Sequence, residues 1–267
     1  MGNNLFDSKD FEFFKGLITG AAGIAHGIQR KNVMVERKAD SSIVTQADLQ
    51  VQDHLISKIS ERYSNVNFIY EENFDTARNE IQDDTVSVII DPIDGTAVFS
   101  MYLPLWCVSI GVFRGYEPVY GFVCSPGAEM LFHNDNEHAY LNNRELSINR
   151  NIEIDTETNI FLASEIPWIC SIDFPGKIRN LGSTAMHACL IADNSRNRSL
   201  AFIGKSYLWD WAGAIPIIIR AGGSVRYISG KEIDYSEIAR NGYGMSDYLV
   251  AYAIEDFSLI QRIFKME

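Results

Sequence analysis

A chain of 267 residues, 46% hydrophobic and 22% charged, is long enough to bury a large core, in one domain or in two closely packed halves. Its 35 acidic and 23 basic side chains give a formal charge of −12, and such an acidic surface repels nucleic-acid backbones. No apolar run reaches the roughly 20 residues of a membrane span, and the N-terminus carries acids where a secretory signal is basic, so we expect a cytoplasmic protein that binds neither nucleic acid nor a membrane.

The first half of the chain alternates helical and extended patterns. Apolar residues spaced three and four apart predict amphipathic helices over 8–30 and 46–63. The run "NVNFIY" predicts a short strand before two acids, and "TVSVII" predicts a second strand that stops at Pro92. From 105 to 141, short apolar runs alternate with turns bearing Gly, Pro and Asn, which is the pattern of an antiparallel meander.

The polar segment 150–157 is the expected seam between two halves. Beyond it the pattern predicts alternating strands and helices, at 158–163, 183–192, 199–203, 210–221, "GGSVRYI", "YLVAYAI" and 255–265. We therefore expect residues 1–150 to form an α+β half with the antiparallel sheet, and residues 151–267 an α/β half. Together they predict one compact unit of the α/β class (α+β by some schemes), with sheets sandwiched by helices.

Cysteine and histidine spacing argues against two common kinds of site. The four cysteines, Cys107, Cys124, Cys170 and Cys189, form no CxxC pair and have apolar neighbours, so we expect them reduced and buried. The five histidines show no HExxH or paired spacing, which argues against a histidine-based zinc site.

The stretch "IIDPIDGTA", residues 89–97, holds two acids three residues apart. Asp91 ends an apolar strand, and Asp94 lies one tight turn later. Pro92 restricts the backbone between the two acids, and Gly95 after them permits backbone angles that other residues resist. Two carboxylates held together repel each other unless a cation lies between them, and Mg²⁺ takes carboxylates together with substrate phosphate. The plainer interpretation is an Asx-type turn at a strand end.

Other acids could complete such a cluster, and each also has a structural interpretation. Because successive strand residues face opposite sides, only one of Glu71 and Glu72 is expected to face the cluster, and Glu72 is the better candidate for a solvated strand-end charge. Asp210 opens an apolar helix, where aspartate is a common N-cap. Asp48 lies near a helix start, where the dipole favours acids and Thr45 is the better N-cap.

Six motifs, taken in order, resemble the inositol monophosphatase family of Mg²⁺-dependent, lithium-sensitive phosphatases. They are "SSIVTQAD" (41–48), "YEE" (70–72), "DPIDGT" (91–96), "LGSTA" (181–185), "WDWAGA" (209–214) and "RAGG" (220–223). Each motif is moderately specific, whereas the ordered set is highly specific and covers nearly the whole chain. The resemblance implies a layered α-β-α-β-α sandwich, hydrolysis of a small phosphate monoester, and a homodimer.

The resemblance also implies a metal-ligand set. Glu71, Asp91 and the carbonyl of Ile93 would bind a first Mg²⁺, and Asp91, Asp94 and Asp210 a second, weaker one. It admits a third, loosely held ion near Glu71. Two such ions neutralise phosphoryl oxygens and lower the pKa of a bound water.

The same resemblance assigns the water and the phosphate. Asp48 and Thr96 would form a dyad that, with Glu71, orients and activates a water. The N–H groups of Gly95 and Thr96, beside Asp94, would hold the phosphate at the start of a short helix.

Departures from the family pattern concern the leaving group. Ile203 stands seven residues before Asp210, where inositol-selective relatives carry a glutamate. This difference puts inositol selectivity in doubt. We hypothesise that Lys205 contacts a second anionic group or a polar substituent of the substrate; otherwise it is an exposed surface lysine. Asn180, Gly182 and Ser183 align with the family's substrate loop and are expected to line the leaving-group pocket. Ala97 and Val98 replace the family's Thr-Asn after "DGT".

Several functions stay open at this point. Within the family, a 3'(2'),5'-bisphosphate nucleotidase usually carries longer insertions in its first half, and fructose bisphosphatases and histidinol-phosphate phosphatases share the motifs. Some bacterial relatives act as binding partners of the transcription or translation machinery, with catalysis dispensable. A phosphate-release assay with Mg²⁺ separates the enzymatic from the binding role.

Overall fold

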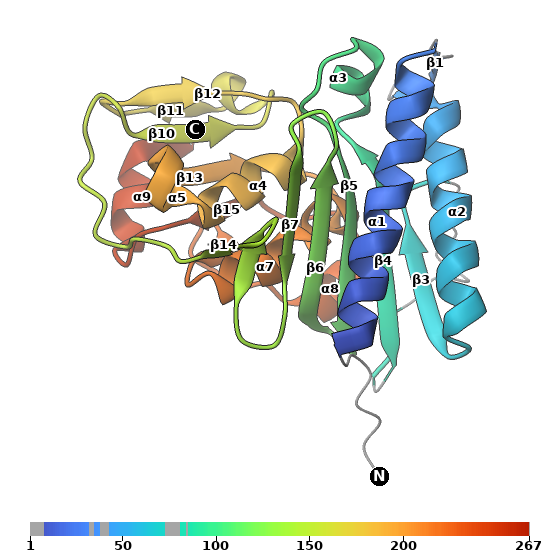
Figure 1. Cartoon of the computed structure of the whole chain (residues 1–267). Helices are drawn as coiled ribbons and strands as arrows, with labels where there is room; N and C mark the ends of the chain where they lie inside the picture. Colours follow the sequence, from blue (N-terminus) through green and yellow to red (C-terminus); the bar gives the residue numbers. More distant parts are fainter. Residues whose placement is uncertain (1–7, 32–34, 38–42, 73–80, 84, 267) are drawn as a thin grey trace.

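The structure is a computed structural model that describes residues 8–31, 35–37, 43–72, 81–83 and 85–266 (Figure 1). Its larger sheet has seven strands in the order β3-β4-β5-β6-β7-β8-β9. The strands β3 and β4 are parallel, and every later neighbour is antiparallel. Their bounds are Val66–Tyr70, Val86–Asp94, Cys107–Arg114, Glu117–Ser125, Met130–Asn134, Ala139–Leu141 and Arg144–Leu146. The meander expected over 105–141 is therefore confirmed.

A mixed five-stranded sheet forms in the second half, in the order β12-β10-β13-β15-β14. The strands β12, β10 and β13 run parallel, and β13, β15 and β14 pair antiparallel. Their bounds are Lys177–Arg179, Asn159–Leu162, Ser199–Gly204, Leu249–Tyr252 and Ser224–Tyr227. Two short pairs, β1 with β2 and β11 with β16, have the bounds Val35–Arg37, Ile43–Thr45, Cys170–Ile172 and Phe264–Met266.

Helices complete a layered sandwich of the expected α-β-α-β-α order (Figure 1). Helices α1 and α2 cover one face of the larger sheet, α4, α6 and α7 lie between the two sheets, and α9 covers the outer face of the smaller one. These six helices span Ser8–Gln29, Gln46–Arg62, Thr184–Ala192, Leu208–Ala212, Ala214–Arg220 and Phe257–Ile263. The other described helices, α3, η1, α5 and α8, span Thr96–Ser100, Ile166–Trp168, Asn194–Asn197 and Tyr235–Arg240.

The expected amphipathic helices bury the apolar faces that predicted them. Phe14 and Ile18 of α1, with Val51 and Leu55 of α2, are buried against the larger sheet. Burying one such side chain stabilises the fold by about 1.5–3 kcal/mol, so these two helices are held mainly by packing. Helix α2 begins after Thr45, whose hydroxyl accepts a hydrogen bond from the Ala47 N–H, and the predicted N-cap is confirmed.

Strand β4 continues through Pro92 to Asp94, so the prediction that it stops at the proline was wrong. Asp91 pairs with Ser109 of β5 and Asp94 with Cys107, and the register is irregular between the two pairs. A bulge of this kind accommodates a residue without an N–H donor, and it re-aims the neighbouring side chains.

The helix expected over 210–221 is two helices, α6 and α7, that meet at Gly213. The helices approach the larger sheet through glycines of its strands. A Cβ on Gly111 would lie 2.5 Å from the Ala212 carbonyl oxygen, and one on Gly121 would lie 1.8 Å from that of Gly213. Backbone therefore packs on backbone here, which fixes α6 against β5, the strand that pairs with β4 and its Asp91.

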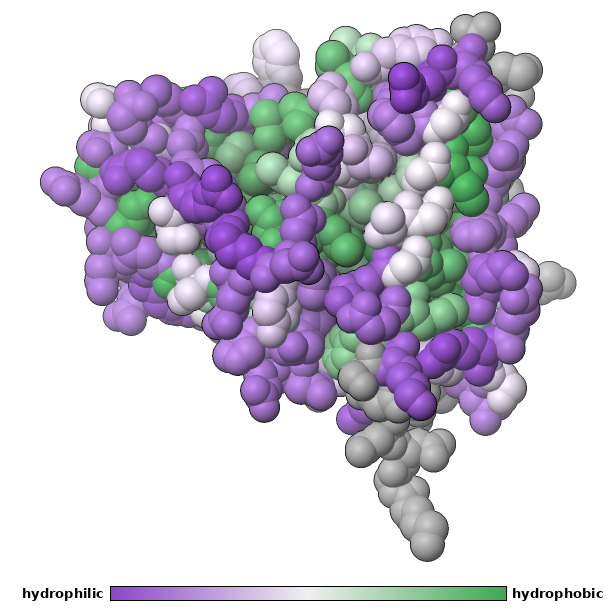
Figure 2. Space-filling view, viewed as in Figure 1, coloured by the Kyte–Doolittle hydropathy of each residue, from purple (hydrophilic) through white to green (hydrophobic). Residues whose placement is uncertain are grey.

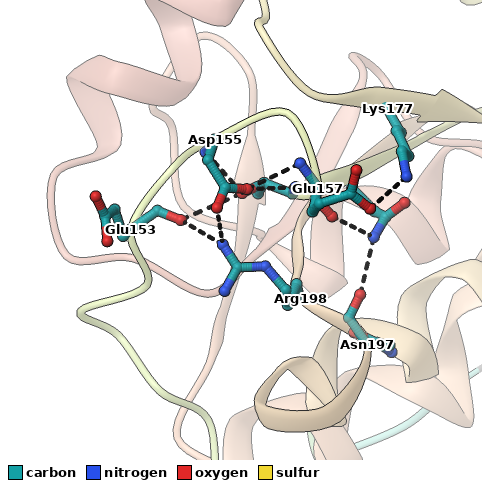
Figure 3. A network of polar contacts seen from close by, with 8 residues as sticks. Glu153, Asp155, Glu157, Lys177, Asn197 and Arg198 are labelled. Atoms are coloured by element: carbon teal, nitrogen blue, oxygen red, sulfur yellow. Dashed lines mark hydrogen bonds and ion pairs between the residues drawn. The ribbon is translucent and has the colours of Figure 1, made fainter.

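Polar side chains of the segment 153–158 fasten it to the smaller sheet (Figure 3). The Arg198 guanidinium donates to the Glu153 carbonyl at 3.0 Å and to the Asp155 carboxylate at 2.8 Å. The Lys177 ammonium pairs with Glu157. The segment expected as a seam thus belongs structurally with the second half, and the boundary at residue 150 stays a prediction.

The surface and the core agree with the composition. Hydrophilic side chains cover most of the face in view, interrupted by apolar ones near its middle and beside α1 (Figure 2). The four cysteines are buried, and none of them forms a disulfide, as expected. Among the described residues, we find no helix with the length and apolarity that a bilayer crossing requires.

Candidate metal centre

Three carboxylates from two distant parts of the chain meet at the end of β4. One oxygen from each of Asp91, Asp94 and Asp210 lies within 4.8 Å of the others. Asp91 and Asp94 are buried, and Asp210, on α6, is partly exposed. The bulge in β4 and the glycine contacts of α6 bring them together.

Asp91 is fully buried, and neither of its carboxylate oxygens has a hydrogen-bond partner in the part of the chain that the structure describes. Burial raises the pKa of Asp91 well above its usual value, and the charges of Glu71, Asp94, Asp210 and Asp48 raise it further. An isolated buried carboxylate is costly unless it is paired or binds a metal. Clustered oxygen donors of this kind fit a hard divalent cation such as Mg²⁺.

Asp94 is held at the N-terminus of α4. The Ser183 hydroxyl donates to Asp94 Oδ2, the Ala185 N–H donates to the same oxygen at 2.6 Å, and the Thr184 N–H donates to Oδ1 at 3.1 Å. The Cys107 thiol lies 3.6 Å from Oδ2. Burial raises the pKa of Asp94 to about 6, although these donors lower it. Because Oδ2 takes most of the donors, Oδ1 keeps more capacity to bind a cation.

Asp210 is the third residue of α6, and its Oδ2 accepts a hydrogen bond from the Tyr207 N–H at 2.7 Å. The N-cap is Tyr207, so the interpretation of Asp210 as the N-cap was wrong by three positions. Burial raises the pKa of Asp210 well above its usual value, and the charges of Asp94 and Glu71 raise it further.

Glu71 and Glu72 both contribute charge to the site. The Glu71 N–H donates to the Ile90 carbonyl at 3.3 Å. The charge of the Glu71 carboxylate raises the pKa of both Asp91 and Asp210. Glu72 is only 4% exposed, so the expectation of a solvated charge was wrong. The Gln52 amide on α2 holds this segment, because it bonds both the backbone N–H and the backbone carbonyl of Glu72, at 3.1 and 3.0 Å.

Asp48 faces the site with one oxygen and caps α2 with the other. Its Oδ2 accepts from the Thr45 N–H and hydroxyl, at 2.7 and 2.6 Å. Its Oδ1 lies 3.5 Å from the Thr96 hydroxyl, which lies closer to the Ile93 carbonyl, at 3.0 Å. Burial raises the pKa of Asp48 to about 7, although the two hydrogen bonds from Thr45 lower it. The capping role and a place beside the acids therefore coexist in one side chain.

Two left-handed glycines lock the "DGT" turn against the "LGSTA" loop. Gly95 has φ 92°, and a Cβ there would lie 2.9 Å from the Gly182 carbonyl oxygen. Gly182 has φ 90°, and its Cβ would lie 2.4 Å from Val98 Cγ1. Any other residue would strain both the backbone and this contact.

A cavity of about 190 Å³ adjoins the acids. Its polar lining comes from three chain segments and includes Ser164, Glu165, Asn180, Thr184, Lys205 and Ser206. Two of the segments reach metal-centre carboxylates. Thr184 donates to Asp94, and a hydrogen bond from Ser206 lowers the pKa of Asp210.

The residues expected in this cavity differ in what they offer it. Asn180, Ser183 and Lys205 all line it, but the Ser183 hydroxyl is committed to Asp94. Ile203 is fully buried among residues of β10, β15 and α9, so its apolar side chain offers the cavity no hydroxyl acceptor.

Glu165 lines the cavity and was not predicted. Strands β10 and β13 are parallel neighbours, and the Ala163 N–H donates to the Ile203 carbonyl at 2.9 Å. Because carboxyl ends of parallel strands share one edge of a sheet, the residues just after each strand lie together. That rule, applied to the predicted strands at 158–163 and 199–203, would have paired Glu165 with Lys205.

Known proteins share this sequence pattern and fold. The sequence model of the inositol monophosphatase family matches residues 9–252. Inositol monophosphatase 1 of Solanum lycopersicum is 30% identical over 241 residues, which cover 84% of this chain and 87% of that protein. The IMPase of Thermotoga maritima superposes with a TM-score of 0.79 at 21% identity, over 96% of both chains. A structure of an IMPase/NADP phosphatase complexed with Mg²⁺ and phosphate, 15% identical, has a TM-score of 0.79 and covers 96% of this chain and 94% of that one.

Proposed function

Because the chain belongs to the inositol monophosphatase family of phosphomonoester hydrolases, we propose that it hydrolyses a small phosphate monoester with Mg²⁺ as its cofactor. The observation that carries the proposal is Asp91, a fully buried carboxylate without a hydrogen-bond partner among the described residues, at the centre of four other acids. Nothing in a stable fold requires such a group, whereas a cation site does.

We assign the ligands as the resemblance implies. Glu71, Asp91 and the Ile93 carbonyl would hold one Mg²⁺, Asp91, Asp94 and Asp210 would hold a second, and a third, loosely held ion would lie near Glu71. When bound, these cations supply charge neutralisation at the phosphoryl oxygens and a water of lowered pKa. The chain's own contribution is to keep five acids in place before any cation arrives.

The attacking water is assigned to Asp48, Thr96 and Glu71. Asp48 Oδ1 is the oxygen that accepts the proton, because Oδ2 is occupied by the two Thr45 bonds. The pKa of Asp48, raised to about 7 by burial, lies where a general base is effective at neutral pH. Thr96, turned by its contact with the Ile93 carbonyl, keeps lone pairs for the water.

The phosphate and the leaving group take neighbouring places. The N–H groups of Gly95 and Thr96, with cations on Asp94, hold the phosphate, and the 190 Å³ cavity takes the alcohol. Asn180 and Lys205 are proposed to contact it directly, whereas Ser183 acts on Asp94. We also propose that the protein is cytoplasmic and forms a homodimer. Light scattering on the purified protein tests the oligomeric state.

Phosphate release from a substrate panel tests the proposal. The panel contains inositol 1-phosphate, 2'-AMP, 3'-phosphoadenosine 5'-phosphate, histidinol phosphate and fructose 1,6-bisphosphate. We expect turnover with Mg²⁺, none with EDTA, and none for Asp91→Asn. Substantial activity in that variant would defeat the metal assignment, and a folded protein without turnover on any monoester would favour the binding role.

A further inference from the structure

The third wall of the cavity, residues 164–165, is attached to the other two walls. The Asn180 side-chain amide donates to the Ser164 hydroxyl at 3.0 Å, and the Lys205 N–H donates to Glu165 Oε1 at 3.3 Å. The wall follows strand β10 and leads into the short helix η1. Glu165 is partly buried, so its carboxylate has a fixed position at the cavity and remains reachable.

Lys205 is the cationic side chain among the cavity's lining residues; it is exposed, and two contacts orient its ammonium. Its ammonium donates to the Ser246 carbonyl at 3.2 Å and lies 5.7 Å from the centre of the Tyr248 ring. An ammonium has three N–H donors and a carboxylate about four acceptor sites, so both Lys205 and Glu165 keep unused capacity after these contacts. Their charges cancel, and the cavity combines a strong donor with a strong acceptor.

We propose that Glu165 determines substrate specificity, and that the leaving group is a neutral alcohol bearing further hydroxyl groups. The inference rests on the proposed phosphatase function. A hydroxyl group donates to Glu165 and accepts from Lys205, which satisfies both. A second phosphate on the substrate would be repelled by the Glu165 carboxylate, and an apolar leaving group would leave both charges without partners. Of the two contacts considered for Lys205, the structure thus favours the polar substituent.

The position of Glu165 also resolves the question raised by Ile203. The resemblance places a hydroxyl-binding glutamate at position 203, but that side chain points into the core of the smaller sheet. Glu165 supplies a carboxylate from the end of the adjacent parallel strand. The same chemistry is thereby available at the cavity from a different segment.

The variant Glu165→Gln separates recognition from positioning. Its side-chain oxygen can still accept the Lys205 N–H, so the wall keeps its attachment while the charge is lost. We expect kcat/KM for inositol 1-phosphate to fall about tenfold or more, mostly through KM, as for one hydrogen bond to a charged group. The rate for para-nitrophenyl phosphate, whose leaving group bears no hydroxyl substituent, stays within about twofold, and that for fructose 1,6-bisphosphate is unchanged or rises.

Glu157→Gln is the matched control, because Glu157 pairs with Lys177 outside the cavity and should leave all three rates unchanged. Equal losses on inositol 1-phosphate and para-nitrophenyl phosphate would show that Glu165 only positions the wall, and would overturn the inference. The inference would also be overturned if the wild type preferred fructose 1,6-bisphosphate and Glu165→Gln kept that preference. If the wild type released phosphate from none of the three, the phosphatase proposal would fail and this inference with it.

Discussion

Replacing Asp91 by asparagine should stabilise the metal-free protein, although most substitutions of buried residues destabilise. The carboxylate is fully buried with neither oxygen bonded among the described residues, and other acids surround it. Asparagine keeps the size and removes the charge, and its amide can donate to Asp94 or Asp210. In the wild type, a bound cation offsets the repulsion, so Mg²⁺ should stabilise the wild type and not the variant.

The sign of the pH dependence follows from proton linkage. The pKa of Asp91 in the folded protein lies well above its usual value of 3.8. The stability that its protonated form contributes is therefore complete below about pH 3.8 and is lost as the pH rises through the folded pKa. At pH 8 we expect Asp91→Asn to gain roughly 1–3 kcal/mol, the cost of a buried polar group left without a hydrogen bond. At about 2 °C in Tm per kcal/mol for a chain of this length, that is about 2–6 °C. Mg²⁺ at 100 times its Kd adds about 2.7 kcal/mol to the wild type alone.

Thermal unfolding in EDTA and in MgCl₂, at pH 6 and pH 8, measures all of these effects. The matched control is Asp193→Asn, because Asp193 is also buried but pairs with Arg144 at 2.7 Å. The substitution Asp193→Asn removes this ion pair and should destabilise the protein with or without Mg²⁺. The reasoning is refuted if Asp91→Asn melts below the wild type in EDTA at pH 8, or if Mg²⁺ raises both Tm values equally.

Three further predictions test neighbouring features. Ser183→Ala removes a donor to Asp94 and the N-cap of α4; we expect the weaker Mg²⁺ site to lose about tenfold in affinity by calorimetry, and the protein about 1 kcal/mol of stability. Asp256→Ala, which uncaps α9, should lose similar stability with unchanged Mg²⁺ affinity. Burial lowers the pKa of His187 from 6.5 to about 3, so the stability it contributes is complete above pH 6.5 and declines as the pH falls toward 3. His187→Gln, which can still accept the Leu181 N–H, should flatten the urea-unfolding profile between pH 7 and pH 5, and an unchanged slope would contradict this. Lithium should inhibit phosphate release by occupying the weaker cation site, and insensitivity at tens of millimolar would contradict a lithium-sensitive site.

Local sequence determined the helices, the strands and the acids at their ends. Hydrophobic periodicity predicts α1 and α2 because a helix repeats every 3.6 residues whatever it packs against. The stretch "IIDPIDGTA" predicts two acids at a strand end because proline and glycine restrict the backbone locally. The resemblance then assigned five ligands, and the fold brings one oxygen from each of three of them, Asp91, Asp94 and Asp210, within 4.8 Å of the others, although Asp210 comes from a helix more than a hundred residues later.

Tertiary structure alone decided which way several side chains face. Glu72 looked like a solvated charge, but the fold buries it beside α2, where the Gln52 amide bonds its backbone N–H and carbonyl. The parallel pairing of β10 and β13 brings Glu165 to the cavity beside Lys205. Parallel neighbours are joined by long crossovers, so contacts between segments some forty residues apart decide which strands pair. The acids of the site were therefore readable from local sequence, whereas the cavity beside them depends on a strand pairing that only the tertiary structure decided.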